Sequence, residues 1–455
     1  MIPAPSSENS YDVVILGGGP AGTATALALK RRDPSCRVAL VERSDYSALR
    51  VGESLPPPAQ ALLRKLGVWE TFLQRSPLES AGTRAAWGSP EMHENEFIFS
   101  PFGRGWHLDR RDFDSMLAQG AERAGVSVFR RTQARLIDQS APWSIHLEVG
   151  DDASASCTIT ARFIVDATGR RSTFARSQGA LPLVFDHLVG VVVFLKFAPE
   201  DRQLDTYTSV EACENGWWYT AVLPCGDMAA IFMTDAALLG SMPWRTLDDW
   251  RTLTAMGPQT SKRIAKGQPL AKPSLHLAES RRLESCVGND WLAVGDAACT
   301  LDPLSSQGVM KGLQSGIEAS LAILSHLKGG SEALAAYDQQ IVENYSRYLD
   351  GRAAYYYLEQ RWPNSPFWKS RHEVVTLHPN EHLCAVSADA VATPLKLSTR
   401  LSASELTVLA QACIQPRPAH QVLAEFKTRS TRPCSDREVL LAMQALLAGG
   451  ILSRN

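Results

Sequence analysis

A glycine-rich turn directly after a short apolar strand constrains the fold of this chain more than any other feature. Residues 11–16 are apolar and β-rich, the sequence GGGPAG follows at 17–22, and the Ala- and Leu-rich residues 23–30 have helical character. In such a turn Gly17 permits the tight bend, Gly19 lets backbone N–H groups approach a pyrophosphate, and Gly22 lets helix and strand pack closely. We therefore expect a Rossmann-type dinucleotide site that includes Gly17, Gly19, Pro20, Ala21 and Gly22.

An acidic residue at the end of the next strand supports this interpretation. Residues 37–41 form a second apolar run that ends in Glu42, 20 positions after Gly22. A carboxylate at this place can accept hydrogen bonds from the two hydroxyls of an adenosine ribose, which favours a ribose without a phosphate. Glu42 and the adjacent Arg43 are therefore predicted cofactor-binding residues.

Two later segments repeat the pattern of strand and small-residue turn. Residues 291–294 lead into Gly295 and Asp296, where the carboxylate can hold a ribityl hydroxyl. Residues 163–165 lead into Asp166 and a turn that contains Gly169. Three such signals across about 300 residues fit one interrupted Rossmann domain better than three separate sites.

The composition of the chain limits the number of domains and the classes of partner. At roughly 150 residues per domain, 455 residues suggest two to three domains. Lys and Arg number 46 against 48 Asp and Glu, so the bulk charge excludes a general polyanion binder. Nine scattered cysteines show neither a C-x-x-C pair nor zinc-ligand spacing, which predicts reduced thiols and no metal site. Because the sequence has no signal peptide and no long apolar run, we expect a soluble, cytoplasmic protein.

Five motifs in order resemble the superfamily of flavin-dependent halogenases and class A monooxygenases. They are GGGPAG, VGESLPP at 51–57, GWHLDRRDFD at 105–114, VDATGRRS at 165–172 and WLAVGDAACTLDPLSSQG at 291–308. The resemblance covers roughly residues 10–370. It implies an α/β fold of the p-hydroxybenzoate hydroxylase type, with FAD in a Rossmann domain and an inserted β-sheet substrate domain. By motif position, Asp296 would hold the ribityl chain, Arg110 would lie close to FAD, and loop 303–308 would line the isoalloxazine ring with Pro303, Ser306, Gln307 and Gly308.

The absence of one lysine separates two kinds of chemistry. Halogenases of this superfamily need a lysine some thirty positions after the glutamate that here is Glu53, yet residues 67–103 contain no lysine. Arg84 is the nearest cation, and its guanidinium is held too strongly protonated to replace an amine. Ser305 also stands where tryptophan halogenases have a glutamate. The sequence therefore favours hydroxylation of an aromatic ring through a flavin C4a-hydroperoxide, with a halogenase as the alternative.

Two groups of residues are candidates for the substrate site. His107 is the predicted proton handler with Glu53 behind it, although a histidine in a strand is more often structural. Trp217, Trp218 and Tyr219 are predicted pocket residues, with core packing as an equal alternative. No second G-x-G-x-x-G occurs, so NAD(P)H visiting the flavin or reduced flavin from a partner reductase would supply electrons, and O2 is the co-substrate.

The C-terminal residues predict a domain of their own. We expect the FAD domain at 1–80, 105–180 and 280–375, the β-rich substrate domain at 81–104 and 181–279, and a linker at 376–400. Three short helices and a β-type end predict a winged-helix-like domain at 401–455. With six Lys and Arg against four Asp and Glu, this domain favours neither DNA binding nor any other nucleic-acid partner. Its expected role is capture of a polypeptide substrate, and a packing cap is the alternative.

Within the superfamily, GTRAAWGS at 82–89, GWWYTAVLP at 216–224 and RWPNSPFW at 361–368 look most like the FAD monooxygenases of tryptophylquinone cofactor biogenesis. That resemblance implies post-translational hydroxylation of a tryptophan in a precursor polypeptide. Two further alternatives are a reductase of the geranylgeranyl reductase type, which needs no oxygen, and a flavin-bound regulator without turnover.

Overall fold

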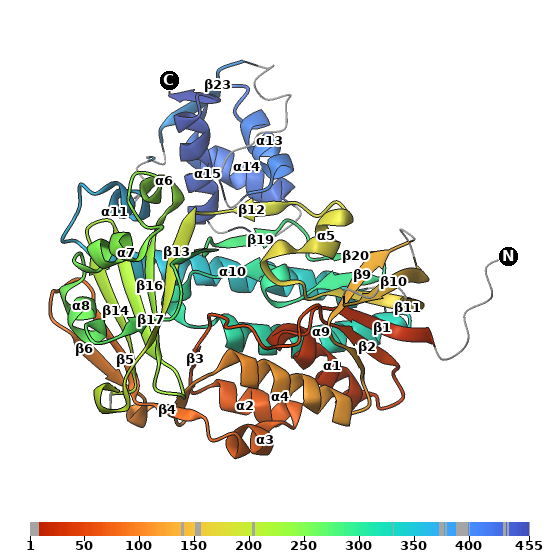
Figure 1. The fold of residues 1–455 in the computed structure, drawn as a ribbon. Coiled ribbons are helices and arrows are strands. Elements are labelled where there is room, and N and C mark those ends of the chain that lie inside the picture. The colour runs from red at the N-terminus through yellow and green to blue at the C-terminus, as the bar shows by residue number, and fades with distance from the viewer. Residues whose placement is uncertain are drawn as a thin grey trace.

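Two large β-sheets lie side by side, and a smaller helical unit lies beyond them at the C-terminal end (Figure 1). These features belong to a computed structural model. It describes residues 9–137, 141–150, 156–202, 205–330, 332–372, 377, 380–387, 399, 401–430, 434 and 436–454.

The first sheet contains the predicted nucleotide-binding strand. Its strand order is β20-β21-β11-β1-β2-β8, and β10 pairs with β11 and β9. β1 runs parallel to both β2 and β11, and β11 runs parallel to β21, so the carboxyl ends of these strands meet at one edge. The strands are β1 (Ser10–Leu16), β2 (Val38–Val41), β8 (Ser127–Phe129), β9 (Thr132–Leu136), β10 (Trp143–Val149), β11 (Cys157–Asp166), β20 (Val287–Gly288) and β21 (Trp291–Ala293).

Small residues bring two helices of this domain into close contact. α1 (Pro20–Arg32) follows the glycine-rich turn, and α9 (Gly308–Leu327) follows loop 303–308. At Gly316 of α9, a Cβ atom would lie 2.6 Å from the carbonyl oxygen of Ala21, so only glycine allows this approach. The contact places the amino ends of α1 and α9 next to each other. Further helices are α2 (Ala59–Leu66), α3 (Trp69–Gln74), α4 (Arg110–Arg123), α5 (Thr173–Ser177) and α10 (Ala333–Tyr357).

The second sheet is built from the two segments expected to form the substrate domain. Its order is β17-β13-β16-β15-β14-β5-β6, with β18 also paired to β13. The strands of its centre are buried along almost their whole length, so this sheet is covered on both faces. The strands are β5 (Gly82–Ala86), β6 (His93–Glu96), β13 (Leu188–Lys196), β14 (Tyr207–Cys213), β15 (Gly216–Val222), β16 (Met228–Asp235), β17 (Gln268–Pro269) and β18 (Ser274–Leu277).

Short strands connect the two large sheets. β12 (Pro182–Val184) pairs with β19 (Arg281–Leu283), not with the second sheet, which begins at β13. The predicted boundary at residue 181 is therefore too early. The remaining elements are β3 (Ser54–Leu55), β4 (Leu78–Ser80), β7 (Gly105–His107), β22 (Cys299–Thr300), α6 (Ala236–Leu239), α7 (Leu247–Thr254), α8 (Pro258–Ile264) and α11 (Pro366–Arg371).

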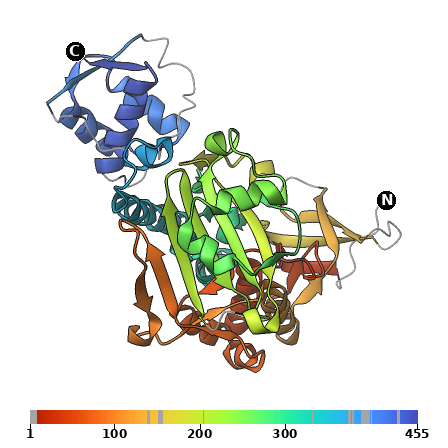
Figure 2. The same ribbon diagram turned by 60° about the vertical axis from the view of Figure 1, so that its left-hand side comes forward.

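The C-terminal unit has a hydrophobic core of its own, whose buried residues all lie between positions 377 and 452. Figure 2 shows it projecting from a corner of the rest of the protein. A capping box of Ser402 and Glu405 fixes the start of its first helix. Its elements are β23 (His382–Ala385), α13 (Ala403–Gln411), β24 (Arg417–Pro418), α14 (Ala419–Arg429), α15 (Asp436–Ala448) and β25 (Leu452–Arg454).

One part of the predicted linker belongs to this unit. β23 falls within 376–400, where no structure was expected, and pairs with both β24 and β25. Most other residues of 376–400 lie outside the described residues. The linker prediction is wrong for β23, because a strand of only four residues, although central in its small sheet, leaves little periodicity in the sequence. In the described parts of the chain, no helix is both long and apolar enough to span a membrane.

Candidate active site

A cavity of about 1060 Å³ is formed by residues of both large sheets. Its wall includes the glycine-rich turn, the end of β2, the start of α4, loop 303–308 and one face of β15 and β16. A volume of this size suits a large cofactor together with a small ring. The predicted site residues that line it are Gly17, Gly19, Pro20, Ala21, Glu42, Arg43, Glu53, Arg110, Gly169, Tyr219, Asp296, Pro303, Ser306 and Gly308.

The three glycines of the turn have different tasks. Gly17 has a φ of +116°, and a Cβ there would lie 2.2 Å from the carbonyl oxygen of Ala167 on the neighbouring segment. A Cβ at Gly22 would lie 1.9 Å from the carbonyl oxygen of Gly17, so Gly22 packs the helix onto the strand without lining the cavity. Gly19, just before α1, has open space in front of it. Backbone N–H groups at this helix start are thus accessible to an anionic group.

Glu42 lines the cavity but also stabilises the turn itself. One carboxylate oxygen accepts a hydrogen bond from the backbone N–H of Gly18 at 2.7 Å, and the other accepts from the backbone and hydroxyl of Ser44. Since a carboxylate can accept about four hydrogen bonds, capacity for a ribose hydroxyl remains. Arg50 lies 3.6 Å from Glu42.

Asp296 is held by two cations. Lys311, one turn into α9, donates to it at 2.8 Å and also to the carbonyl oxygen of Cys299, and Arg170 lies 3.8 Å away. Burial by itself would raise the pKa of Asp296, but Lys311 and Arg170 lower it below the usual value. The aspartate is therefore ionised at neutral pH and can accept hydrogen bonds. Lys311 was not predicted from the sequence, since no motif links it to Asp296.

Arg110 is fixed at the start of α4 by a bidentate contact. Its Nε and Nη2 each donate to the Asp114 carboxylate at 2.9 Å, and Nη1 donates to the carbonyl oxygen of Val51 at 2.8 Å. Asp114 is fully buried. The guanidinium is thus held in one orientation at the cavity wall.

Several residues that were predicted to bind the cofactor do not line the cavity but shape the segments around it. Asp166 is buried and its carboxylate accepts from Thr168 and from the backbone of Ala175, so it shapes the turn after β11. At Gly295, with a φ of +57°, a Cβ would lie 2.5 Å from the Cβ of Ala21. Gln307 precedes α9 and does not line the cavity. Direct contact of Gly22, Asp166, Gly295 and Gln307 with the cavity is therefore not observed.

His107 does not face the cavity. Its side chain is fully buried, Nε2 lies 2.6 Å from the carbonyl oxygen of Thr206, and Nδ1 has no hydrogen-bond partner among the described residues. Burial lowers the pKa of His107 to about 4, so the ring is neutral. The structure contradicts the interpretation of His107 as proton handler, because the residue does not line the cavity and its Nε2 contacts the backbone of Thr206.

Of the three predicted pocket residues, only Tyr219 reaches the cavity. Side chains alternate along β15, so Trp217 and Tyr219 share one core and Trp218 belongs to another. Both tryptophans are fully buried. Trp217 donates from Nε1 to the hydroxyl of Tyr356 at 3.0 Å, which makes it a packing and positioning residue.

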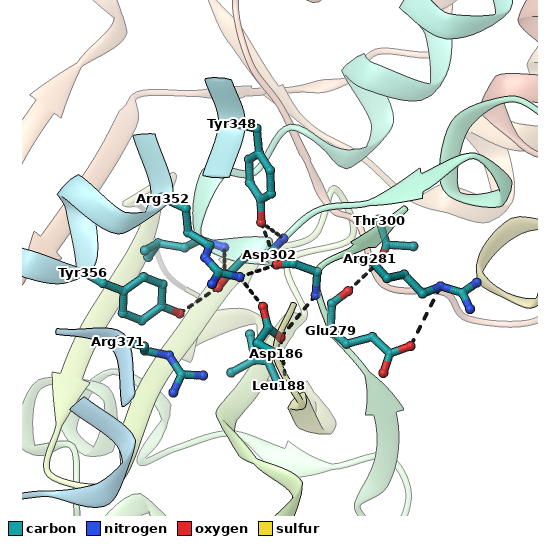
Figure 3. A network of polar contacts seen from close by, with 12 residues as sticks. Asp186, Leu188, Glu279, Arg281, Thr300, Asp302, Tyr348, Arg352, Tyr356 and Arg371 are labelled. Atoms are coloured by element: carbon teal, nitrogen blue, oxygen red, sulfur yellow. Dashed lines mark hydrogen bonds and ion pairs between the residues drawn. The ribbon is translucent and has the colours of Figure 1, made fainter. Parts of the chain in front are cut away.

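Figure 3 shows how α10 binds the segment before loop 303–308. Tyr356 donates to the buried Asp302 carboxylate at 2.8 Å, and the Tyr348 hydroxyl accepts from the backbone N–H of Asp302 at 2.6 Å. Arg352 forms an ion pair with Asp186 and donates to Ser280. Asp302 in turn accepts from the backbone of Leu304. Loop 303–308 is thus anchored to α10 by buried polar contacts.

A match to a protein-family model shows to which family this chain belongs. The model of the tryptophan halogenase family matches residues 12–103 and 74–428. The chain belongs to this family of flavin-dependent enzymes. Membership implies an FAD-dependent enzyme that uses reduced flavin and O2. The putative FAD-dependent oxidoreductase LodB of Marinomonas mediterranea is 31% identical over 370 residues, which are 80% of this chain and 97% of the relative.

Two solved structures show the same α/β fold. The myxobacterial chondrochloren halogenase CndH superposes with a TM-score of 0.72 at 23% identity, over 81% of this chain and 87% of that one. The peptidyl tryptophan dihydroxylase QhpG superposes with a TM-score of 0.63 at 21% identity, over 97% of this chain and 99% of that one. The second superposition extends through the C-terminal unit.

Proposed function

We propose that this protein is an FAD-dependent monooxygenase that hydroxylates an aromatic ring, specifically a tryptophan side chain of a precursor polypeptide. The observation that carries the proposal is the chemistry of the cavity wall. Its cationic residues are arginines only, namely Arg43, Arg50, Arg110, Arg170 and Arg171, and none of the described residues that line the cavity is a lysine. A site without an amine there favours transfer of oxygen over transfer of halogen.

The residues present fit FAD. The open space before Gly19 accommodates a pyrophosphate at the start of α1, and Glu42 lies where a ribose would be. Asp296 is ionised and available to a ribityl hydroxyl, and α9 begins directly at the cavity with Gly308. When bound, FAD supplies the activation of O2. The chain's own contribution is to orient the substrate ring next to it and to exclude water.

A polypeptide substrate is supported by the C-terminal unit. This unit has a separate core, and the dihydroxylase of peptidyl tryptophan aligns through it. A module that binds part of a polypeptide raises the effective concentration of the target side chain at the cavity. NAD(P)H or a partner flavin reductase would supply the electrons, and the cytoplasm is the proposed location.

The test is oxygen uptake and product mass with FAD-loaded protein and NADH or NADPH. Free tryptophan and the precursor polypeptide encoded by a neighbouring gene are compared side by side, with protein stripped of FAD as control. We expect one or two oxygen atoms on the polypeptide alone. Modification of free tryptophan or an unrelated phenol, without change to the polypeptide, contradicts the polypeptide substrate.

The second candidate is a flavin-dependent halogenase, which the names of most relatives favour. The same assay distinguishes it when chloride or bromide and chemically reduced flavin are added. Incorporation of halogen into an indole or a pyrrole, in place of oxygen, would establish the halogenase and overturn the proposal.

A further inference from the structure

Polar groups are rare on the part of the cavity wall formed by the second sheet. Tyr219 on β15 pairs across the sheet with Ile231, and the apolar side chains of Ile231 and Met233 line the cavity beside it. The Tyr219 side chain reaches this wall although the residue is only 5% exposed. A ring that enters this part of the cavity therefore meets apolar surface and one phenolic hydroxyl.

The neighbours of the Tyr219 hydroxyl leave one of its hydrogen-bonding positions free. The Ser54 hydroxyl lies 2.8 Å from the Tyr219 hydroxyl and 2.8 Å from the hydroxyl of Thr208. Tyr219 also interacts with the carboxyl group of Glu53 and with Thr208. The Thr208 hydroxyl can donate its proton to Ser54 in place of Tyr219. A phenol has one proton to donate and two lone pairs to accept with. If Tyr219 donates to Glu53 and accepts from Ser54, one lone pair remains for a donor in the cavity.

Glu53 is suited to receive a proton from Tyr219. It lies just before β3 in the cavity wall, is 1% exposed, and its Oε1 has no hydrogen-bond partner among the described residues. The titratable and charged groups that face it are the Tyr219 hydroxyl from β15 and the Arg110 guanidinium from α4. Burial raises the pKa of Glu53 above the usual value, so its carboxylate is a stronger base than an exposed one.

We infer that Tyr219 binds the N–H group of an N–H heteroaromatic substrate and relays its proton to Glu53. The inference rests on the proposed function. As the ring carbon forms its bond to the electrophilic oxygen, positive charge develops on the ring nitrogen. The N–H bond then breaks and leaves its electron pair in the ring. The proton passes to the Tyr219 oxygen while the Tyr219 proton passes to the Glu53 carboxylate, so no further reactant is needed for this step.

The relay thus takes the role predicted for His107. It also defines the class of ring: an indole or pyrrole that keeps its N–H is bound, and an N-alkylated ring is not. A site that pairs a buried hydroxyl with a substrate N–H rejects the analogue that lacks it, because the hydroxyl is then left without its partner.

Binding of two small probes to the oxidised, FAD-loaded full-length protein tests the inference without turnover. Indole and 1-methylindole are titrated and followed by the flavin absorbance. Wild type should bind indole about tenfold more tightly, as expected for one buried hydrogen bond. The variant Tyr219→Phe should bind both probes within about twofold of each other. Equal binding of the two probes by wild type, or no binding of indole, overturns the inference.

Tyr337→Phe is the matched control. Tyr337 is a buried tyrosine of α10 whose hydroxyl donates to the carbonyl oxygen of Ala293, and it does not line the cavity. Its variant loses a comparable buried hydrogen bond and should keep the preference for indole. A preference that persists in Tyr219→Phe would show steric rejection of the methyl group and would also overturn the inference.

Turnover separates the roles of the two residues. In the binding titration, Glu53→Gln should keep the preference for indole over 1-methylindole. On the tryptophan substrate that wild type oxygenates, the rate of Glu53→Gln should be at least tenfold lower than that of wild type. The rate of this variant should also no longer fall at acid pH. Protonation of Glu53 causes that fall in wild type, since only the carboxylate accepts a proton. An unchanged acid limb in Glu53→Gln contradicts the relay. If wild type oxygenates no tryptophan substrate, the proposed function fails, whereas the probe titration still decides on N–H binding.

Discussion

At the scale of single residues, His107 shows what burial does to a titratable side chain in this fold. Its pKa is lowered to about 4 in the folded protein, while an unfolded chain has a histidine pKa of about 6.5. The unfolded state therefore binds a proton more readily, and the stabilising effect is present above pH 6.5 and is lost as the pH falls towards 4. The difference corresponds to about 3 kcal/mol in the free energy of unfolding.

We expect His107→Gln to remove this acid sensitivity. Chemical denaturation at several pH values between 7 and 4 should show a smaller loss of unfolding free energy in the variant than in wild type. His93→Gln, on the exposed strand β6, is the control and should follow wild type. If the free energy of unfolding falls with pH to the same extent in His107→Gln and in wild type, the histidine is not buried in its neutral form.

Residue-scale prediction from the sequence succeeded where backbone geometry demands one amino acid. Gly17 and Gly22 could be placed because no side chain fits their contacts. The direction of His107 could not be predicted, since a strand of three residues between two partners has no alternation to read. The burial of Trp217 and Trp218 could not be predicted either. A strand that is covered on both faces lacks the alternation of apolar and polar residues that would distinguish its two faces.

At the scale of elements, α10 supports loop 303–308 through Tyr356. The tyrosine hydroxyl lies between the indole of Trp217 and the carboxylate of Asp302, and all three side chains are buried. Removing the hydroxyl leaves a buried donor and a buried acceptor unpaired, which costs about 1–3 kcal/mol for each group. The loop that follows Asp302 lines the cavity, so a loss of order there should also weaken FAD binding.

We expect Tyr356→Phe to lower the thermal stability and to raise the dissociation constant of FAD severalfold, measured by flavin fluorescence. Tyr355→Phe is a close control, because Tyr355 is the preceding residue of α10 and is 64% exposed. It should change neither quantity. A Tyr356→Phe variant that loses stability but binds FAD like wild type would show that the network supports α10 alone.

The order of elements explains why the discontinuous first sheet could be predicted from the sequence, whereas the places where its segments begin and end could not. Each return to the first sheet, at β1, β11 and β21, ends in a turn of small residues that the sequence displays. β12 and β23 carry no such signal and pair with strands distant in the sequence, β19 and β25. Pairing of this kind is decided by tertiary packing, which a local pattern does not record.

At the scale of the whole molecule, the cavity and the C-terminal unit are separate structures. The cavity wall comes from both large sheets, whereas the described residues in the buried core of the C-terminal unit all lie at position 377 or later. One described contact of the C-terminal unit with the rest of the protein is the Ser404 hydroxyl, which donates to the Glu284 carboxylate at 3.5 Å. A unit built in this way can be removed without opening the core of either sheet.

A chain that ends at residue 372 should therefore keep FAD and its fold, since α11 and the whole cavity wall remain. If the C-terminal unit captures the polypeptide, the KM for the precursor should rise at least tenfold, because the target side chain loses its raised local concentration. The dissociation constant for free indole, measured by the flavin absorbance, should stay within about twofold of wild type. FAD content and circular dichroism measured on the same sample show whether the shortened chain is folded. A loss of indole binding together with the loss of activity on the precursor, in a folded, FAD-loaded sample, would instead assign the unit to packing of the flavin domain.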